Sequence, residues 1–120
     1  AAEAALRHAI AAIQRDHDVH CHLYGGFNRP PKPLDAAATR LFELVRDCGA
    51  ALGLSIGWNA TGGVCDGNNI AACGIPVVDT MGPRGGAIHS SDEFLIVDSL
   101  AERAQLSALT LMKIAERGTV

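Results

Sequence analysis

The chain has 120 residues, a mass of 12.5 kDa and a formal net charge of −3, with 48% hydrophobic and 19% charged residues. This apolar content is too high for a disordered chain and predicts a packed core. The slightly acidic balance, with scattered Lys and Arg, gives no electrostatic footprint for nucleic acid. No apolar stretch approaches the roughly 18 residues of a membrane span. Neither a nucleic-acid-binding protein nor a membrane protein is therefore expected.

The beginning of the chain predicts one helix and one strand. Residues 3–14 are good helix formers, with apolar side chains at spacings of four and three. Over 19–23, apolar and polar residues alternate, which is typical of a half-buried strand. Segment 28–33 contains three prolines, two of them adjacent, and proline lacks a backbone donor. We therefore expect this segment to separate two structural units.

Three helices are predicted after the prolines. The first covers 34–52, with Asp35 in its cap or first turn and Gly53 at its left-handed end. The second is short and lies around 66–73. The third covers 99–117 and begins with a Ser-x-x-Glu pattern, which indicates a capping box.

Two short apolar segments, 54–58 and 75–78, lie between these helices and are compatible with strands. Strands joined through a helix favour parallel neighbours in a covered sheet, so the predicted fold class is α/β. Ligands of open α/β sheets bind at the carboxyl ends of the strands. Two glycine-rich loops, 61–69 and 79–93, follow the segments and are the expected location of a site.

His89 is the only histidine after the prolines, and it lies in the longer loop. A neutral imidazole there is a natural zinc ligand, and neighbouring acids such as Glu93 could orient it. The alternative is a loop histidine that bonds to its own turn, since one histidine makes no metal site. His20 and His22 share one face of the predicted strand, although a polar outer face with Cys21 inward is the interpretation we favour.

The cysteine content favours a reducing compartment. Four cysteines among 120 residues do not make a disulfide-dense composition, and their spacing fits no zinc knuckle. We expect buried free thiols and a cytoplasmic protein; the residues concerned are Cys21, Cys48, Cys65 and Cys73.

Three motifs in order resemble one enzyme family. Residues 85–94 read Gly-Gly-Ala-Ile-His-Ser-Ser-Asp-Glu-Phe and lead into Asp-Ser-Leu at 98–100. This segment resembles the last motif of the zinc-dependent aminoacylase and carboxypeptidase family, which includes glutamate carboxypeptidase, acetylornithine deacetylase and succinyl-diaminopimelate desuccinylase. Residues 62–67 are similar to the family's Gly-Gly-x-x-Asp-small turn. Residues 28–30 resemble the segment where the family's smaller lid domain ends.

The resemblance implies a C-terminal fragment of such an enzyme. Residues 1–27 would be the last helix and strand of an α+β lid domain, which is also the dimerisation domain. Residues 28–33 would be a proline-rich linker. Residues 34–120 would be the C-terminal part of a three-layer zinc-peptidase-like catalytic domain with parallel strands.

The resemblance also implies roles for individual residues. His89 matches the terminal ligand of a two-zinc centre. Arg29 matches an arginine that holds the substrate's carboxylate, for which a planar bidentate donor is well suited. Gly62 and Gly63 would lend backbone contacts to the substrate.

The same resemblance leaves the chain without a catalytic residue. Asp66 would cap a helix and Glu93 would support the metal ligand, but the family's other ligands and its general base are absent. We therefore expect part of a zinc-dependent hydrolase that cleaves an amide bond of N-acyl amino acids or small peptides. It would be inactive without the remainder of the catalytic domain, and its parent would form a homo-oligomer. The alternative is a non-catalytic module that pairs with another chain through the exposed strand 19–23.

Overall fold

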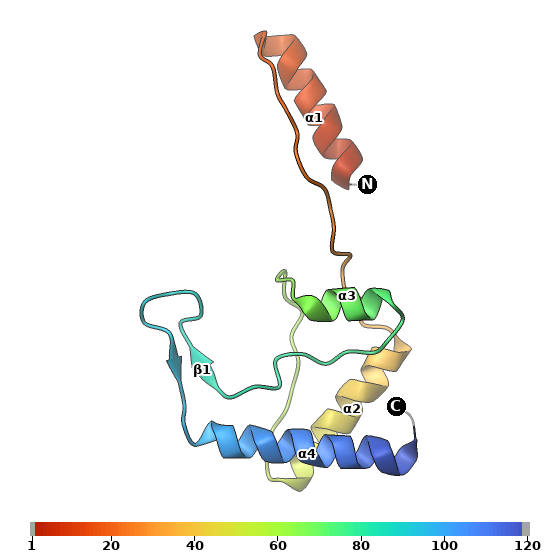
Figure 1. Cartoon of the computed structure of the whole chain (residues 1–120), viewed down its shortest axis with the longest axis vertical. Coiled ribbons are helices and arrows are strands. Elements are labelled where there is room, and N and C mark those ends of the chain that lie inside the picture. Colours follow the sequence, from red (N-terminus) through yellow and green to blue (C-terminus); the bar gives the residue numbers. More distant parts are fainter. Residues whose placement is uncertain (1, 119–120) are drawn as a thin grey trace. The chain divides into compact units, whose positions relative to one another are not determined.

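The computed structural model describes residues 2–118, which Figure 1 shows coloured along the sequence. The chain divides into two compact units, residues 1–30 and 31–120. The boundary between them lies within the proline-rich segment 28–33. About half of the described residues are helical, and their one sheet consists of two short antiparallel strands.

The first unit is a helix followed by an extended segment. Helix α1 (Ala2–His17) contains no buried residue. The segment after it runs back along the helix (Figure 1), and the N–H of Cys21 donates to Gln14 Oε1 at 2.8 Å. The predicted strand 19–23 is wrong: the segment is drawn out along the helix (Figure 1), but it is not a strand and pairs with no other strand within the described residues.

The three helices predicted for the second unit are confirmed. They are α2 (Ala36–Ala51), α3 (Asp66–Ala72) and α4 (Ser99–Arg117). Asp35 is the N-cap of α2, and its carboxylate accepts a hydrogen bond of 2.8 Å from the backbone of the first turn. Gly53 follows with φ of 75°, the left-handed conformation that ends many helices.

A small hydrophobic core lies between α2 and α4. Leu44, Val45 and Cys48 of α2 pack with Leu106 of α4, and Leu106 is fully buried. Six partly buried hydrophobic side chains surround this cluster: Leu54, Ile56, Val78, Met81, Leu109 and Ile114.

The predicted parallel sheet of a three-layer α/β domain is wrong. Segments 54–58 and 75–78 contribute side chains to the core, but neither forms a strand. The sheet consists instead of β1 (Gly85–Gly86) and β2 (Phe94–Leu95), which form an antiparallel hairpin. Apolar patterning marks a segment as buried and extended, whereas a ladder also needs a neighbouring backbone about 4.8 Å away. These two segments pack against helices through their side chains without such a neighbour among the described residues.

The predicted capping box of α4 is also wrong. The N-cap is Asp98, and Ser99 is fully buried as the first helical residue. The Ser99 hydroxyl accepts a hydrogen bond from the N–H of Arg84 at 2.8 Å and donates to the carbonyl of Ile96 at 2.5 Å. Glu102 does not reach back to the cap but pairs with the Arg84 guanidinium at 3.2 Å. These bonds attach the hairpin to the start of α4.

Much apolar surface is uncovered. The run Phe94–Val97 is exposed, and so is an outer face of α4 that includes Leu100, Leu111 and Met112. None of the described helices is long and apolar enough to cross a membrane.

Candidate functional site

The hairpin loop carries His89. Its side chain is exposed at the tip between β1 and β2, rather than enclosed by aliphatic residues. Its backbone is in the left-handed region with φ of 67°, and its N–H donates to Glu93 Oε2 at 3.3 Å. Glu93 therefore binds the backbone of His89. This backbone contact differs from the orientation of the imidazole that the sequence predicts for Glu93.

The turn before α3 differs by one residue from its prediction. The N-cap is Cys65, and Asp66 is the first residue of the helix. The N–H of Cys65 donates to Asn68 Oδ1 at 3.1 Å, which satisfies a backbone donor at the start of the helix. Asp66 thus lies where a negative charge is favourable, in the first turn, without being the cap.

Gly62 and Gly63 lie in an exposed part of the same turn. Neither has a positive φ, and a Cβ atom on Gly62 would meet open space. The backbone conformation does not require glycine at these positions. What the missing side chains provide is access to the backbone from outside the unit.

Sequence reasoning missed a polar cluster centred on Asp79. The Cys65 thiol donates to Asp79 Oδ2 at 2.9 Å, and the Lys32 ammonium forms an ion pair with the same oxygen. The hydrogen bond from Cys65, followed by the hydrogen bond from Lys32, lowers the pKa of Asp79 from its usual 3.8. Asp79 directly follows the apolar segment 75–78. The rule that ligands bind at the carboxyl ends of strands could therefore have pointed to Asp79 as a site residue.

The predicted site residues do not all share one unit. Arg29 is an exposed residue of the first unit, whereas the glycines, Asp66 and His89 belong to the second. Within the second unit, the polar contacts nearest to the predicted site residues form two separate sets, one around Asp79 and one within loop 87–93.

The expectation of four buried thiols is only partly met. Cys48 is buried in the core and Cys21 is half-buried, whereas Cys65 and Cys73 are exposed. All four lie within the described residues, and none forms a disulfide.

The described residues do not form a zinc site by themselves. Among residues 2–118, no group of three or more His, Cys, Asp or Glu could hold a metal ion. A zinc site in a protein takes at least three protein ligands, and His89 supplies one donor. His20 and His22 are exposed on the segment that follows α1, where the His22 ring lies 6.2 Å from that of Tyr24.

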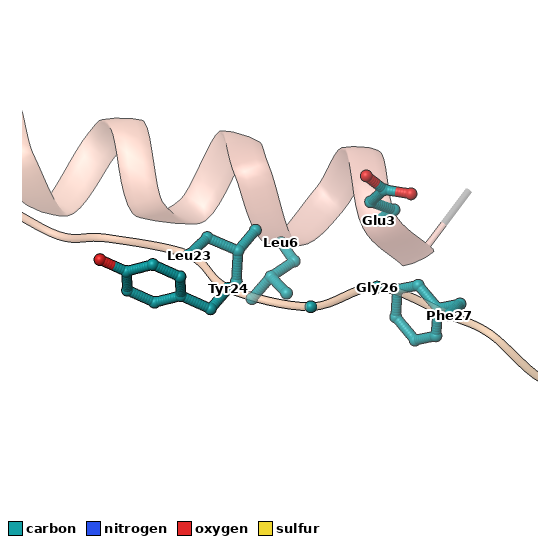
Figure 2. Close-up of a pocket in the computed structure, with 7 residues that line it drawn as sticks. Glu3, Leu6, Leu23, Tyr24, Gly26 and Phe27 are labelled. Atoms are coloured by element: carbon teal, nitrogen blue, oxygen red, sulfur yellow. The ribbon is translucent and has the colours of Figure 1, made fainter.

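The first unit has an apolar hollow between α1 and the extended segment (Figure 2). Glu3 is the one carboxylate in its wall, and Arg7 already pairs with it at 2.7 Å. The hollow therefore offers contact surface rather than a reacting group. Its lining consists of Glu3, Leu6, Leu23, Tyr24, Gly25, Gly26 and Phe27.

Comparison with protein-family models, curated proteins and solved structures gives no significant match. The functional interpretation therefore depends on the residues themselves and on the order of their motifs.

Proposed function

We propose that the chain is the C-terminal portion of a zinc-dependent metallohydrolase that cleaves an amide bond of N-acyl amino acids or small peptides. The observation that carries this proposal is the presentation of His89. Its imidazole is exposed at the tip of a hairpin, in the middle of the motif Gly-Gly-Ala-Ile-His-Ser-Ser-Asp-Glu. An exposed imidazole on a loop that hydrogen bonds hold in place is suited to be one metal ligand when the other ligands come from the remainder of a longer chain.

The uncovered apolar surface supports the same proposal. The outer face of α4 and the run Phe94–Val97 are exposed, although such surfaces are normally buried. The remainder of a catalytic domain would cover surface of this kind. A helix that is apolar on two opposite faces is typical of the interior of a larger protein.

The proposed contributions of this chain are binding contributions. The Arg29 guanidinium is suited to a bidentate contact with a substrate carboxylate. Gly62 and Gly63 leave backbone groups accessible to a substrate, and His89 supplies one metal donor. In the family that the sequence resembles, the general base and the other metal ligands precede the part that this chain matches, so we expect the isolated chain to be inactive. A cytoplasmic location is part of the proposal, and it rests on the cysteine content and spacing of the sequence.

The coding sequence upstream of Ala1 tests this proposal first. It should continue the reading frame and encode a His-x-Asp pair and an acidic pair that completes the ligands and the general base. A start codon beside Ala1, without these residues upstream, would contradict the proposal.

The longer chain then permits a direct test with two histidine variants. In His89→Ala, we expect loss of bound zinc and a fall in amide hydrolysis of at least about a hundredfold, because even a residue that only hydrogen-bonds to a metal ligand is worth about 10–100-fold. His20→Ala is the matched control and should retain both zinc and activity. Zinc content by mass spectrometry and hydrolysis of N-acyl amino acids give the readouts. Unchanged zinc in His89→Ala would contradict the assignment.

The second candidate function is a non-catalytic module that pairs with another copy through segment 19–23. It is favoured by the extended conformation of this segment, which has no strand partner among the described residues. Leu23→Pro removes a backbone donor within the segment and should abolish self-association. Phe27→Pro, outside the segment, should leave it intact. Analytical ultracentrifugation distinguishes the two, and a monomeric wild-type chain would exclude this function.

A further inference from the structure

The loop between β1 and β2 holds two non-glycine residues in the left-handed backbone region. Ala87 has φ of 53° and His89 has φ of 67°. Residues with a Cβ atom rarely adopt this conformation, and it persists only where surrounding structure holds it. Both residues are exposed, so core packing does not hold them. The hydrogen bonds of the loop must do so.

Ser90 makes four of these hydrogen bonds. Its backbone N–H and its hydroxyl both donate to the carbonyl of Ala87, at 3.1 and 2.7 Å. Its hydroxyl oxygen accepts from the N–H of Asp92 at 3.1 Å, and its carbonyl accepts from the N–H of Glu93 at 3.3 Å. Ser90 therefore closes the turn on each side of itself, and His89 lies inside the first of these turns.

The hydroxyl accounts for two of the four bonds and is the part that alanine would remove. The neighbouring Ser91 takes part in none of these four bonds and is exposed as well. The pair of serines thus separates the effect of the Ser90 hydroxyl from the effect of removing any hydroxyl from this loop.

We propose that Ser90 is a positioning residue for His89. This inference rests on the proposed function, in which the His89 imidazole is a metal ligand. Because the Ser90 hydroxyl ties Ala87 to Asp92, it holds the backbone of His89 at its positive φ and so fixes the direction in which the ring leaves the loop. An imidazole that is already held in one direction does not have to reorient when the other ligands and the metal ion come together around it.

The test compares Ser90→Ala, Ser91→Ala and Ser90→Thr in the isotope-labelled chain by NMR. In Ser90→Ala, we expect amide hydrogen exchange at His89 to accelerate about tenfold and the χ1 couplings of His89 to become averaged. Ser91→Ala should change exchange less than about twofold. Ser90→Thr keeps the hydroxyl and should restore the wild-type couplings. The urea midpoint of the chain should be the same in all three variants.

Three results would overturn the inference. These are unchanged His89 couplings in Ser90→Ala, equal changes in Ser91→Ala, or a fall in the urea midpoint that parallels the loss of His89 order. The readouts need no zinc. A failure of the proposed function would instead be seen in the zinc content of the longer chain, so the two failures are distinguishable.

Discussion

Asp79 connects three parts of the second unit through one carboxylate. Cys65 donates to it from the start of α3, and Lys32 reaches it from the proline-rich segment. A Cβ atom on Gly67 would lie 3.1 Å from the same carboxylate, so a side chain there would have to displace the carboxylate by a few tenths of an ångström. The position of α3 therefore depends on this cluster.

The lowered pKa of Asp79 predicts a stability that depends on pH. Since the folded-state pKa is below the usual 3.8, the stabilisation is complete above the unfolded-state pKa and is lost as pH falls through the folded value. Asp79→Asn should lower the free energy of unfolding at pH 7 by about 0.5–1 kcal/mol, the range for partly exposed ion pairs. The difference from wild type should shrink as pH falls below 3.8 and vanish once pH is below the folded-state pKa of Asp79.

Urea unfolding between pH 7 and 3 measures this effect. Asp92→Asn, in the exposed hairpin loop, is the control and should keep the wild-type pH dependence. A constant difference between Asp79→Asn and wild type at every pH would show that the carboxylate charge is not responsible.

Residue-level predictions succeeded where a local rule decides the structure. Asp35 and Gly53 have local capping roles, and both were predicted. Ser99 matched a capping box, but a tertiary contact with the hairpin at Arg84 competes for its hydroxyl. Asp79 was missed because its partners lie 47 and 14 residues away in the sequence.

The helix α4 has apolar residues on two opposite faces. Leu106 and Thr110 are buried against the rest of the unit, whereas Leu111 and Met112 are 66% and 60% exposed. A surface helix normally has one apolar stripe. Its second stripe is therefore available to another structural layer.

The two faces predict different costs for the same substitution. Leu106→Ala should lower the free energy of unfolding by about 2–5 kcal/mol, because it opens a cavity in a small core. Leu111→Ala should change it by less than about 0.5 kcal/mol, since the side chain is exposed. Urea unfolding of the isolated chain gives both values. Equal losses would mean that the outer face is covered in solution.

Elements with a local signal were predictable, and the pairing of strands was not. Helical periodicity and capping residues predict the helices, because each of these signals depends only on residues a few positions apart in the sequence. Segments 54–58 and 75–78 carried a correct signal for burial but no information about a backbone neighbour. The sequence predicts a loop where the hairpin forms, because the Gly85–Gly86 strand lacks the branched or aromatic residues typical of strands.

The candidate site was predictable only as separate motifs. His89 and the turn at Gly62 were located by sequence motif, and the structure describes how each is held. The expected bond from Glu93 to the His89 ring could not be distinguished from a bond to the backbone, because both need the same spacing. No sequence pattern predicts the hydrogen bonds that the Ser90 hydroxyl makes within the loop.

At the scale of the whole molecule, the two units differ in how they are stabilised. The second unit has a buried cluster, whereas α1 contains no buried residue. An isolated helix of 16 residues is marginal in water without tertiary packing. The salt bridge between Glu3 and Arg7 adds only a few tenths of a kcal/mol.

This difference predicts uneven hydrogen exchange. Amides of α1 should exchange with protection below about tenfold, whereas amides of α2 near Leu44 should approach the protection set by global unfolding. Exchange followed by mass spectrometry resolves the two helices. Protection of α1 equal to that of α2 would indicate that a partner covers the first unit.

The run Phe94–Val97 has a consequence for the life of the chain in a cell. Four consecutive apolar residues, two of them β-branched and none charged, are exposed beside an open hairpin edge. Such a segment is a template for aggregation. The steady-state amount of this chain should therefore follow the amount of whatever shields the segment, with any unshielded excess removed by chaperones and proteases.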